Sequence, residues 1–144
     1  MLVWQDAKLL LIERAKFPFG FAIPAGHVDG DSSFEAAAQR ELEEEVGLKV
    51  ESMNLAIEGR KNNPCRREDG TWHQWKIFET TISGTLARSK EETKRAGWYS
   101  KEEISDLASR TEKYLAKEIS EQVWEQNPGL EPVMYDWFKK LEII

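Results

Sequence analysis

The sequence predicts an α/β fold in which a mixed β-sheet is packed between helices. Three features predict it: strands separated by a turn open the chain, a helix rich in alanine and glutamate follows, and a long aromatic strand comes later. The chain has 144 residues, of which 40% are hydrophobic and 32% charged, as is typical of a globular domain. We therefore expect a single domain over residues 1–144.

The first third of the chain predicts strands interrupted by breakers. Val3-Trp4 indicates a strand, residues 5–8 a turn, and residues 9–14 a second strand whose apolar run suits burial on both faces. The aromatic stretch at 17–21 contains a proline and a glycine and predicts a loop. A short strand at 21–23 should end at the proline that follows.

A helix is predicted from about Ser33 to the residue before Gly47. Ser32 and Glu35 have the spacing of a capping box, and Gly47 suits the left-handed position that ends a helix. Apolar side chains recur at intervals of four and form one stripe: Ala38, Leu42 and Val46. One side of this helix should therefore pack against the core.

Later segments predict further strands and helices. Residues 50–59 and 72–82 indicate strands with turns at 62–64 and 68–70 between them, and Trp98-Tyr99 indicates a short late strand.

The C-terminal part should be helical. Ser100 with Glu103, and Ser109 with Glu112, have the spacing of two capping boxes, so two helices are expected to start there. Residues 127–129 (Asn-Pro-Gly) should break the second of them, and Pro132 suits the first turn of a last helix.

Charge and composition exclude several classes of protein. The net charge of −6, from 26 acidic and 20 basic residues, argues against a nucleic-acid partner, because such binding relies on Lys and Arg. No apolar run approaches the roughly 18 residues that a membrane span needs, and no membrane partner is expected. The start lacks a secretory signal and the one cysteine has no disulfide partner, so a cytoplasmic protein is expected.

Three glutamates of the predicted helix lie on one face. Glu41, Glu44 and Glu45 are three and four residues apart, which places their carboxylates within roughly 100° of one another. Like charges at this spacing repel by a few tenths of a kcal/mol per pair, and a bound divalent cation would explain the arrangement. Mg²⁺ prefers oxygen ligands of this kind. The alternative is a solvated helix face with no ligand.

The segment from residue 26 to residue 48 resembles the signature box of the Nudix hydrolases. Eight residues match it at fixed spacing: Gly26, Arg40, Glu41, Leu42, Glu44, Glu45, Gly47 and Leu48. One position departs, because Ser32 stands where the family has its first glutamate, directly after Asp31. The resemblance covers about residues 1–108, and we assign the helices from about 109 to the same domain.

The resemblance implies a Nudix-type α/β/α sandwich and a metal-dependent hydrolase. It assigns metal binding to Glu44 and Glu45, to the carbonyl of Gly26 and to Glu41, with Mg²⁺ as the expected ion and Mn²⁺ as an alternative. Arg40 resembles the residue that orients a neighbouring glutamate. Glu41 resembles the base in some members, but which glutamate takes the proton stays open.

In several Nudix hydrolases a loop before the late strand adds a further carboxylate to the metal site. Glu92 is placed for that role here. The alternating charges of residues 89–94 would equally suit an exposed loop.

The resemblance also implies a nucleotide substrate. The expected reaction is hydrolysis of the diphosphate linkage in a nucleoside diphosphate joined to another group, as in nucleoside triphosphates, ADP-ribose or nucleotide sugars. A proline 16 residues past Leu48 resembles a cue for ADP-ribose pyrophosphatases, whereas the chain length is more similar to triphosphate pyrophosphatases. A catalytically silent nucleotide-binding or sensor domain is the alternative, given Ser32, and a homodimer is left open.

Four side chains are candidates for substrate binding. His27 follows the box glycine and is placed to approach phosphates, and Arg14 ends the second strand. Trp72 or Trp75 would stack on a base, an interaction worth about 1–3 kcal/mol in single-strand binders, or else belong to the core. A basic group follows the box, and phosphate contact and solubility explain it equally well: Arg60, Lys61, Arg66 and Arg67.

No zinc site is expected from the sequence. His27 and His73 are the only histidines, and neither has a histidine or cysteine partner at metal-ligand spacing. Cys65 is expected to be structural, because nothing nearby marks it as a nucleophile.

Overall fold

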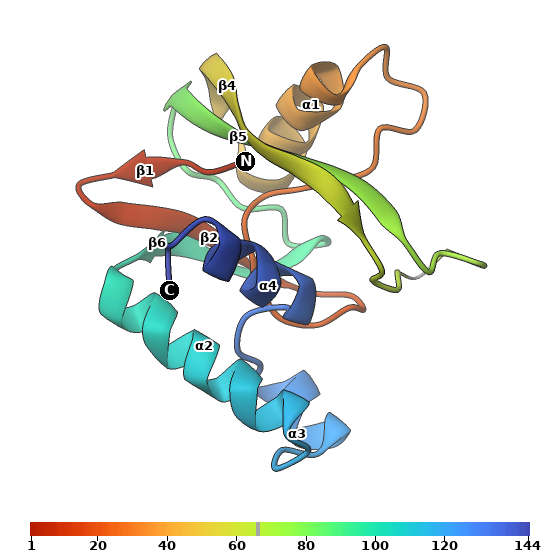
Figure 1. Ribbon diagram of the computed structural model, residues 1–144. Helices are drawn as coiled ribbons and strands as arrows, with labels where there is room; N and C mark the ends of the chain where they lie inside the picture. Colours follow the sequence, from red (N-terminus) through yellow and green to blue (C-terminus); the bar gives the residue numbers. More distant parts are fainter. Residues whose placement is uncertain (66) are drawn as a thin grey trace.

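A computed structural model describes residues 1–65 and 67–144. Its main sheet is built around β2 (Lys8–Arg14), which pairs antiparallel with β1 (Trp4–Gln5) and β3 (Phe21–Ala22) along one edge and with β6 (Thr93–Tyr99) along the other (Figure 1). The four apolar residues 9–12 of β2 are each at most 1% exposed. The prediction of a second strand buried on both faces is confirmed.

A second sheet consists of the long antiparallel pair β4 (Lys49–Lys61) and β5 (His73–Ser83). Leu2 joins the two sheets, since its N–H donates to the Phe78 carbonyl (2.7 Å) and its carbonyl accepts from the Thr80 N–H (2.9 Å). This bridge is parallel, whereas the ladders are antiparallel. The mixed character of the predicted sheet therefore comes from short bridges between antiparallel strands.

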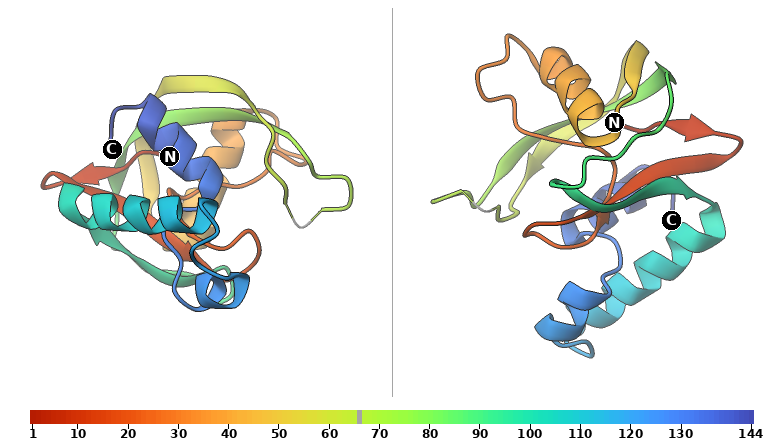
Figure 2. Two further views of the ribbon diagram at one scale, coloured as in Figure 1. Left: turned by 60° about the horizontal axis from the view of Figure 1, so that its bottom comes forward. Right: turned by 180° about the vertical axis from the view of Figure 1, so that it is seen from behind.

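Helices cover opposite sides of the strands. α1 (Phe34–Val46) lies on one side, and α2 (Lys101–Leu115), α3 (Glu121–Gln126) and α4 (Pro132–Lys140) lie on the other (Figures 1 and 2). The predicted α/β sandwich is confirmed.

Alternate residues of β2 serve the two sides. Leu10 and Ile12 belong to the core that contains Leu42 and Val46 of α1. Leu9 and Leu11 belong to the second core, which residues of α2 and α4 complete: Ile104, Met134 and Phe138. Because side chains of a strand alternate between its faces, one apolar run supplies both cores.

The N-cap of the box helix lies one residue later than predicted. Ser33, not Ser32, is the N-cap: it is extended (φ −160°, ψ 168°) and its Oγ accepts from the Ala36 N–H at 3.0 Å. Ser32 is exposed. The predicted stop is confirmed, because Gly47 is left-handed (φ 71°) and its N–H donates to the Glu43 carbonyl.

The boundaries of the C-terminal helices differ from the prediction, because α2 ends at Leu115 and α3 starts separately after Ser120. Ser109 does not start a helix, since α2 is continuous to Leu115 and the Ser109 Oγ donates to the Ser105 carbonyl (3.0 Å). Burial of Ile104, Ala108 and Thr111 along one face of α2 carries the helix through the predicted boundary.

The late strand is longer than predicted. β6 begins at Thr93, because pairing with β2 recruits a polar segment whose sequence favours a loop. The capping box at Ser100 and the start of α4 at Pro132 are as predicted.

Among the residues that the structure describes, no helix combines the length and the apolar character that crossing a membrane requires.

Replacing Ser33 by alanine should destabilise the protein by about 1 kcal/mol, because an N-cap hydrogen bond is lost. Ser32→Ala is the matched control and should change the free energy of unfolding by less than about 0.5 kcal/mol. Urea unfolding of both variants measures the difference. Equal destabilisation by the two substitutions would contradict the assignment of the cap.

Candidate active site

A pocket of ≈ 300 Å³ opens between the box loop, α1, β5 and the connection from β4 to β5. It brings together side chains that are far apart in the sequence, including Arg14, His27, Glu41, Glu45, Trp75 and Glu92. Most of the residues that the sequence marks as a site therefore share one cavity.

Glu45 is the most deeply buried acid of α1. It is 7% exposed, and one of its carboxylate oxygens accepts from the Ala25 N–H at 3.0 Å. Burial and the neighbouring carboxylate of Glu41 raise the pKa of Glu45 to about 8, against a smaller opposing effect of the Arg14 guanidinium. Burial likewise raises the pKa of Glu41, although Arg40 opposes the shift. The two carboxyls form a desolvated acidic pair in the pocket.

Arg40 holds the box loop and the acidic helix face together. Its guanidinium donates to Asp31 (2.9 and 3.0 Å), to the His27 carbonyl (3.0 Å), to Glu41 (2.9 Å) and to Glu44 (2.9 Å). These hydrogen bonds, with Asp31 first, raise the pKa of Arg40 and keep it charged. One side chain thus orients two of the three box glutamates and the loop opposite them.

The three box glutamates do not converge on one point. Glu41 and Glu45 line the pocket, whereas the Glu44 side chain is 57% exposed and pairs with Arg40. Helical spacing places them on one broad face, but the arginine draws the Glu44 carboxylate to the outer side of it.

Gly26 makes a close approach to Glu41. A Cβ at position 26 would lie 1.8 Å from the Glu41 Cδ, so any side chain at this position would push the Glu41 carboxylate aside. Gly30, in the same loop, has no heavy atom within 4 Å of the corresponding position. Glycine at 26 therefore lets the carboxylate of Glu41 pack directly on the backbone of the box loop.

Comparison with known proteins decides the family. The NUDIX domain profile matches residues 1–121, which include the whole box and its pocket-lining glutamates. This chain belongs to the Nudix hydrolase family. It is a Nudix-type pyrophosphohydrolase, as the resemblance of the box predicted.

Named relatives agree with this assignment. An ADP-ribose pyrophosphatase of Methanocaldococcus jannaschii is 31% identical over 116 residues, which is 79% of this chain and 67% of that protein. A MutT protein from Methanosarcina mazei Go1 superposes with a TM-score of 0.67 at 17% identity, covering 98% of this chain and 88% of the other. A MutT NUDIX hydrolase from Burkholderia pseudomallei gives 0.61 at 24% identity, covering 71% and 80%. The two structures share the fold.

Ser32, the position at which this Nudix box departs from its family, directly follows an aspartate that is hydrogen-bonded. Ser32 is exposed, but Asp31 accepts two hydrogen bonds from Arg40. The loop before α1 is therefore tied to the helix by a carboxylate one residue earlier.

Sequence reasoning missed a buried acid on the far wall of the Nudix pocket. Glu131, just before α4, is 4% exposed and lies 3.8 Å from the Arg14 guanidinium. Burial raises the pKa of Glu131 to about 6, and Arg14 opposes the shift. The sequence feature that could have indicated it is a glutamate inside the apolar stretch from 130 to 135, because glutamates are rarely buried without a partner.

Glu92 lies at the rim of the pocket. Its carboxylate accepts from the Lys16 ammonium at 2.8 Å, and its side chain is 42% exposed. The structure thus places the predicted extra ligand on the pocket wall, beside a lysine.

The two candidate tryptophans lie in different surroundings. Trp75 lines the pocket, and its Nε1 donates to the Asn63 side chain at 3.2 Å. Trp72 precedes β5, is 50% exposed and stacks under the Arg60 guanidinium at 4.1 Å. It is not among the residues that line the pocket, so Trp75 is the one of the two candidates that the pocket contains.

The basic group after the box is largely paired. Arg60 covers Trp72, Lys61 donates to Asp136 (3.2 Å), and Arg67 donates to Asp29 (2.5 Å). Arg66, the fourth predicted member, lies outside the described residues. Of the described three, Arg67 is the one that lines the pocket.

Gly26→Ala should lower kcat for hydrolysis by about 100-fold or more, because the new methyl group displaces the Glu41 carboxylate and misplacement by about 1 Å costs that much. Gly30→Ala is the control and should keep kcat close to that of the wild type. Steady-state kinetics of the two variants test this. A similar loss in both would show that the loop, rather than the contact with Glu41, is sensitive.

Proposed function

We propose that this Nudix enzyme is a divalent-metal-dependent hydrolase that cleaves the diphosphate linkage of a nucleoside diphosphate joined to a sugar, of the ADP-ribose class. The observation that carries the proposal is the acidic pair of Glu41 and Glu45, which faces a pocket lined on other sides by Arg14 and aromatic residues.

The residues fit a Mg²⁺ or Mn²⁺ ion. Mg²⁺ is commonly bound by one or two carboxylates together with waters and substrate phosphates. Glu41 and Glu45 supply such a pair, and the backbone of Gly26 lies against Glu41. The buried carboxyl of Glu45 has the Ala25 N–H as a partner but a second acid beside it, an arrangement that a divalent cation would stabilise.

The chain's own residues divide the chemical work. A bound divalent ion would neutralise charge on the diphosphate oxygens and lower the barrier to attack by water. Glu41 stands at the pocket with its carboxylate positioned by Arg40, so it is placed to take the proton of the attacking water. We assign contact with phosphate oxygens to Arg14, whose Nε lies 3.8 Å from the Glu131 carboxylate in the same cavity.

We propose different metal-binding roles for Glu45, Glu44 and Glu92. Glu45 is the buried member of the metal-binding pair. Glu44 would reach the ion only if it released Arg40, and Glu92, which also lines the pocket, would join after release from Lys16. These two are proposed as ligands recruited with substrate rather than as the core of the site.

The shape of the cavity supports a substrate made of two groups joined by a diphosphate. A second pocket of ≈ 390 Å³ adjoins the first, and five residues line both: Phe17, Pro18, Asn63, Pro64 and Glu131. Aromatic side chains of the C-terminal helices, Tyr114 and Trp124, line the second pocket. We propose that the diphosphate occupies the first pocket and one terminal group the second. The similarity to an ADP-ribose pyrophosphatase favours a sugar on one side.

A substrate screen tests the proposed class. Nucleoside triphosphates, nucleotide sugars, ADP-ribose and dinucleotides are incubated with Mg²⁺ or Mn²⁺, and the products are identified by mass. We expect the highest kcat/KM with ADP-ribose or a related nucleotide sugar, with release of a nucleoside monophosphate. Preference for triphosphates would contradict the substrate class. Nucleotide binding without turnover on any of these compounds would contradict the proposed reaction.

Glutamine substitutions test the roles of the acids. Glu45→Gln and Glu41→Gln should each lower kcat by about 100-fold or more, since a base or ligand that acts in the transition state typically contributes that much. Glu43→Gln is the control, because Glu43 is exposed on the same helix and does not line the pocket. Titration of Mg²⁺ tests the ligand role: because Glu41 and Glu45 are both proposed ligands, each substitution should raise the half-saturating concentration. Wild-type rates in the Glu45 variant would overturn the proposed metal site.

A further inference from the structure

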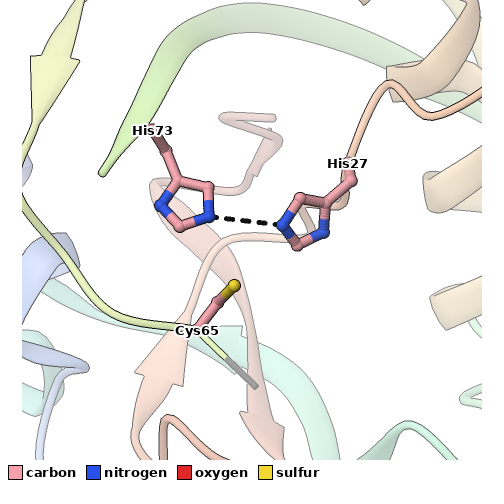
Figure 3. Close-up of side chains that lie close together, drawn as sticks. All are labelled: His27, Cys65 and His73. Atoms are coloured by element: carbon pink, nitrogen blue, oxygen red, sulfur yellow. Dashed lines mark hydrogen bonds between the residues drawn. The ribbon is translucent and has the colours of Figure 1, made fainter. Parts of the chain in front are cut away.

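Three side chains with nitrogen and sulfur ligand atoms meet at the pocket wall, and the acidic site does not use them as ligands. His27 follows the box glycine, Cys65 lies in the connection between β4 and β5, and His73 is the first residue of β5 (Figure 3). One ligand atom from each lies within 4.8 Å of the others. Among the described residues this is the only group of three or more such side chains found that close together.

We propose that His27, Cys65 and His73 form a Zn²⁺ site that ties the β4–β5 connection to the box loop. It is distinct from the carboxylate site, because imidazole and thiolate ligands favour zinc and similar transition metals, whereas Mg²⁺ favours oxygen. The sequence analysis predicts no zinc site, because the three residues are separated by 37 and 7 intervening positions.

The two imidazoles already have the separation that zinc requires. Their Nε2 atoms are 3.3 Å apart. Two nitrogens bound at about 2.0–2.1 Å with a tetrahedral angle between them lie about 3.3 Å apart, and a sulfur bound at about 2.3 Å lies about 3.6 Å from each. Because the ligand atoms lie within 4.8 Å of one another, the sulfur needs to approach by roughly 1.2 Å at most. Figure 3 shows the Cys65 side chain directed toward the space between the two rings.

The hydrogen bonds of His73 prepare it to bind a metal. Its Nδ1 lies 3.1 Å from the Asn63 carbonyl, which can only accept, so Nδ1 carries the proton. The lone pair of His73 is then on Nε2, directed at His27. A backbone carbonyl that fixes the tautomer of a histidine in this way is the usual outer partner of a metal-bound imidazole.

His27 is suited to the same role. Its Nε2 lies 3.3 Å from the Nε2 of His73, the atom on which His73 carries its lone pair. In the absence of metal its Nε2–H donates to His73. When the ion binds, this proton moves to Nδ1 of the same ring and the thiol proton of Cys65 leaves to solvent, so each ligand presents a lone pair.

The surroundings of Cys65 accommodate a metal-bound sulfur. The Arg67 N–H donates to Sγ at 3.4 Å, and the Cys65 N–H donates to the Gly70 carbonyl at 2.9 Å, which fixes the turn. A Cβ at position 70 would lie 2.4 Å from Sγ, so glycine leaves the space that the sulfur occupies. Asp29 pairs with the Arg67 guanidinium and offsets its positive charge near the sulfur.

Three protein ligands leave one tetrahedral position open. Because all three residues line the pocket, that position is available to water or to a substrate oxygen. The ion would hold together two loops that otherwise meet through the histidine contact and the pair of Arg67 with Asp29. The proposal does not depend on which substrate the enzyme cleaves.

Cobalt titration of the metal-stripped protein tests the site. With Mg²⁺ in excess to occupy the carboxylates, we expect one Co²⁺ per chain, with the intense visible bands of tetrahedral cobalt and a sulfur-to-cobalt charge-transfer band. Zn²⁺ should displace it. Cys65→Ser should abolish the charge-transfer band and weaken Zn²⁺ binding by at least about 100-fold, since even loss of an outer-shell partner costs 10- to 100-fold. Zn²⁺ should also raise the Tm of the wild type more than that of Cys65→Ser.

Two further variants keep the result interpretable. His73→Gln should lose tetrahedral cobalt binding, and circular dichroism shows whether each variant is folded. The double variant Glu41→Gln, Glu45→Gln should keep the charge-transfer band, which separates this site from the proposed hydrolytic one. Weak octahedral bands that are unchanged in Cys65→Ser, or displacement of Co²⁺ by Mg²⁺, would overturn the proposal.

Discussion

Burial of β2 on both faces is the constraint on which the rest of this structure depends. Its run of four apolar residues supplies alternate side chains to two cores, and each fully buried Leu or Ile stabilises the fold by about 1.5–3 kcal/mol. The box helix packs on one side of this strand and the C-terminal helices on the other (Figure 1). The strand ends at Arg14, so the same element that organises the cores delivers a cation to the pocket.

Within that frame, one arginine organises the acidic surface of the box. Arg40 bonds the loop through Asp31 and the His27 carbonyl, and it bonds the helix through Glu41 and Glu44. Its charge offsets part of the repulsion that three clustered carboxylates would otherwise cause. Glu45 receives no bond from Arg40 and is the most desolvated of the three. The three glutamates therefore differ in solvent exposure, from Glu44, which is exposed and paired with Arg40, to Glu45, which is buried.

Two kinds of ligand chemistry share the pocket. Carboxylates from the box helix offer hard oxygen atoms, and the cluster of His27, Cys65 and His73 offers nitrogen and sulfur. His27 lies beside the box glycine, and its carbonyl accepts from Arg40, so the two sets are mechanically connected through one residue. Any shift of the box loop would therefore move ligand atoms of both the carboxylate set and the histidine–cysteine set. The connection from β4 to β5 forms part of the same wall and contributes Asn63 and Arg67 as well as the sulfur.

The sequence by itself determined the features that depend on local spacing. Local spacing along the chain predicts the apolar strand at 9–12, the box helix with its glycine stop, the cap at Ser100 and the Nudix box. Over about one turn or one strand, side-chain chemistry acts directly on the backbone. Pairing with β2 extended β6 to Thr93, and packing carried α2 past Ser109, since these outcomes depend on distant partners.

Only the tertiary structure decided which side chains share the pocket. Glu131 reaches Arg14, Cys65 reaches two histidines, and Glu44 turns to Arg40 through contacts that spacing along the chain does not encode. Local spacing favours a helix, a turn or a strand, whereas a site forms where segments distant in the sequence meet in space.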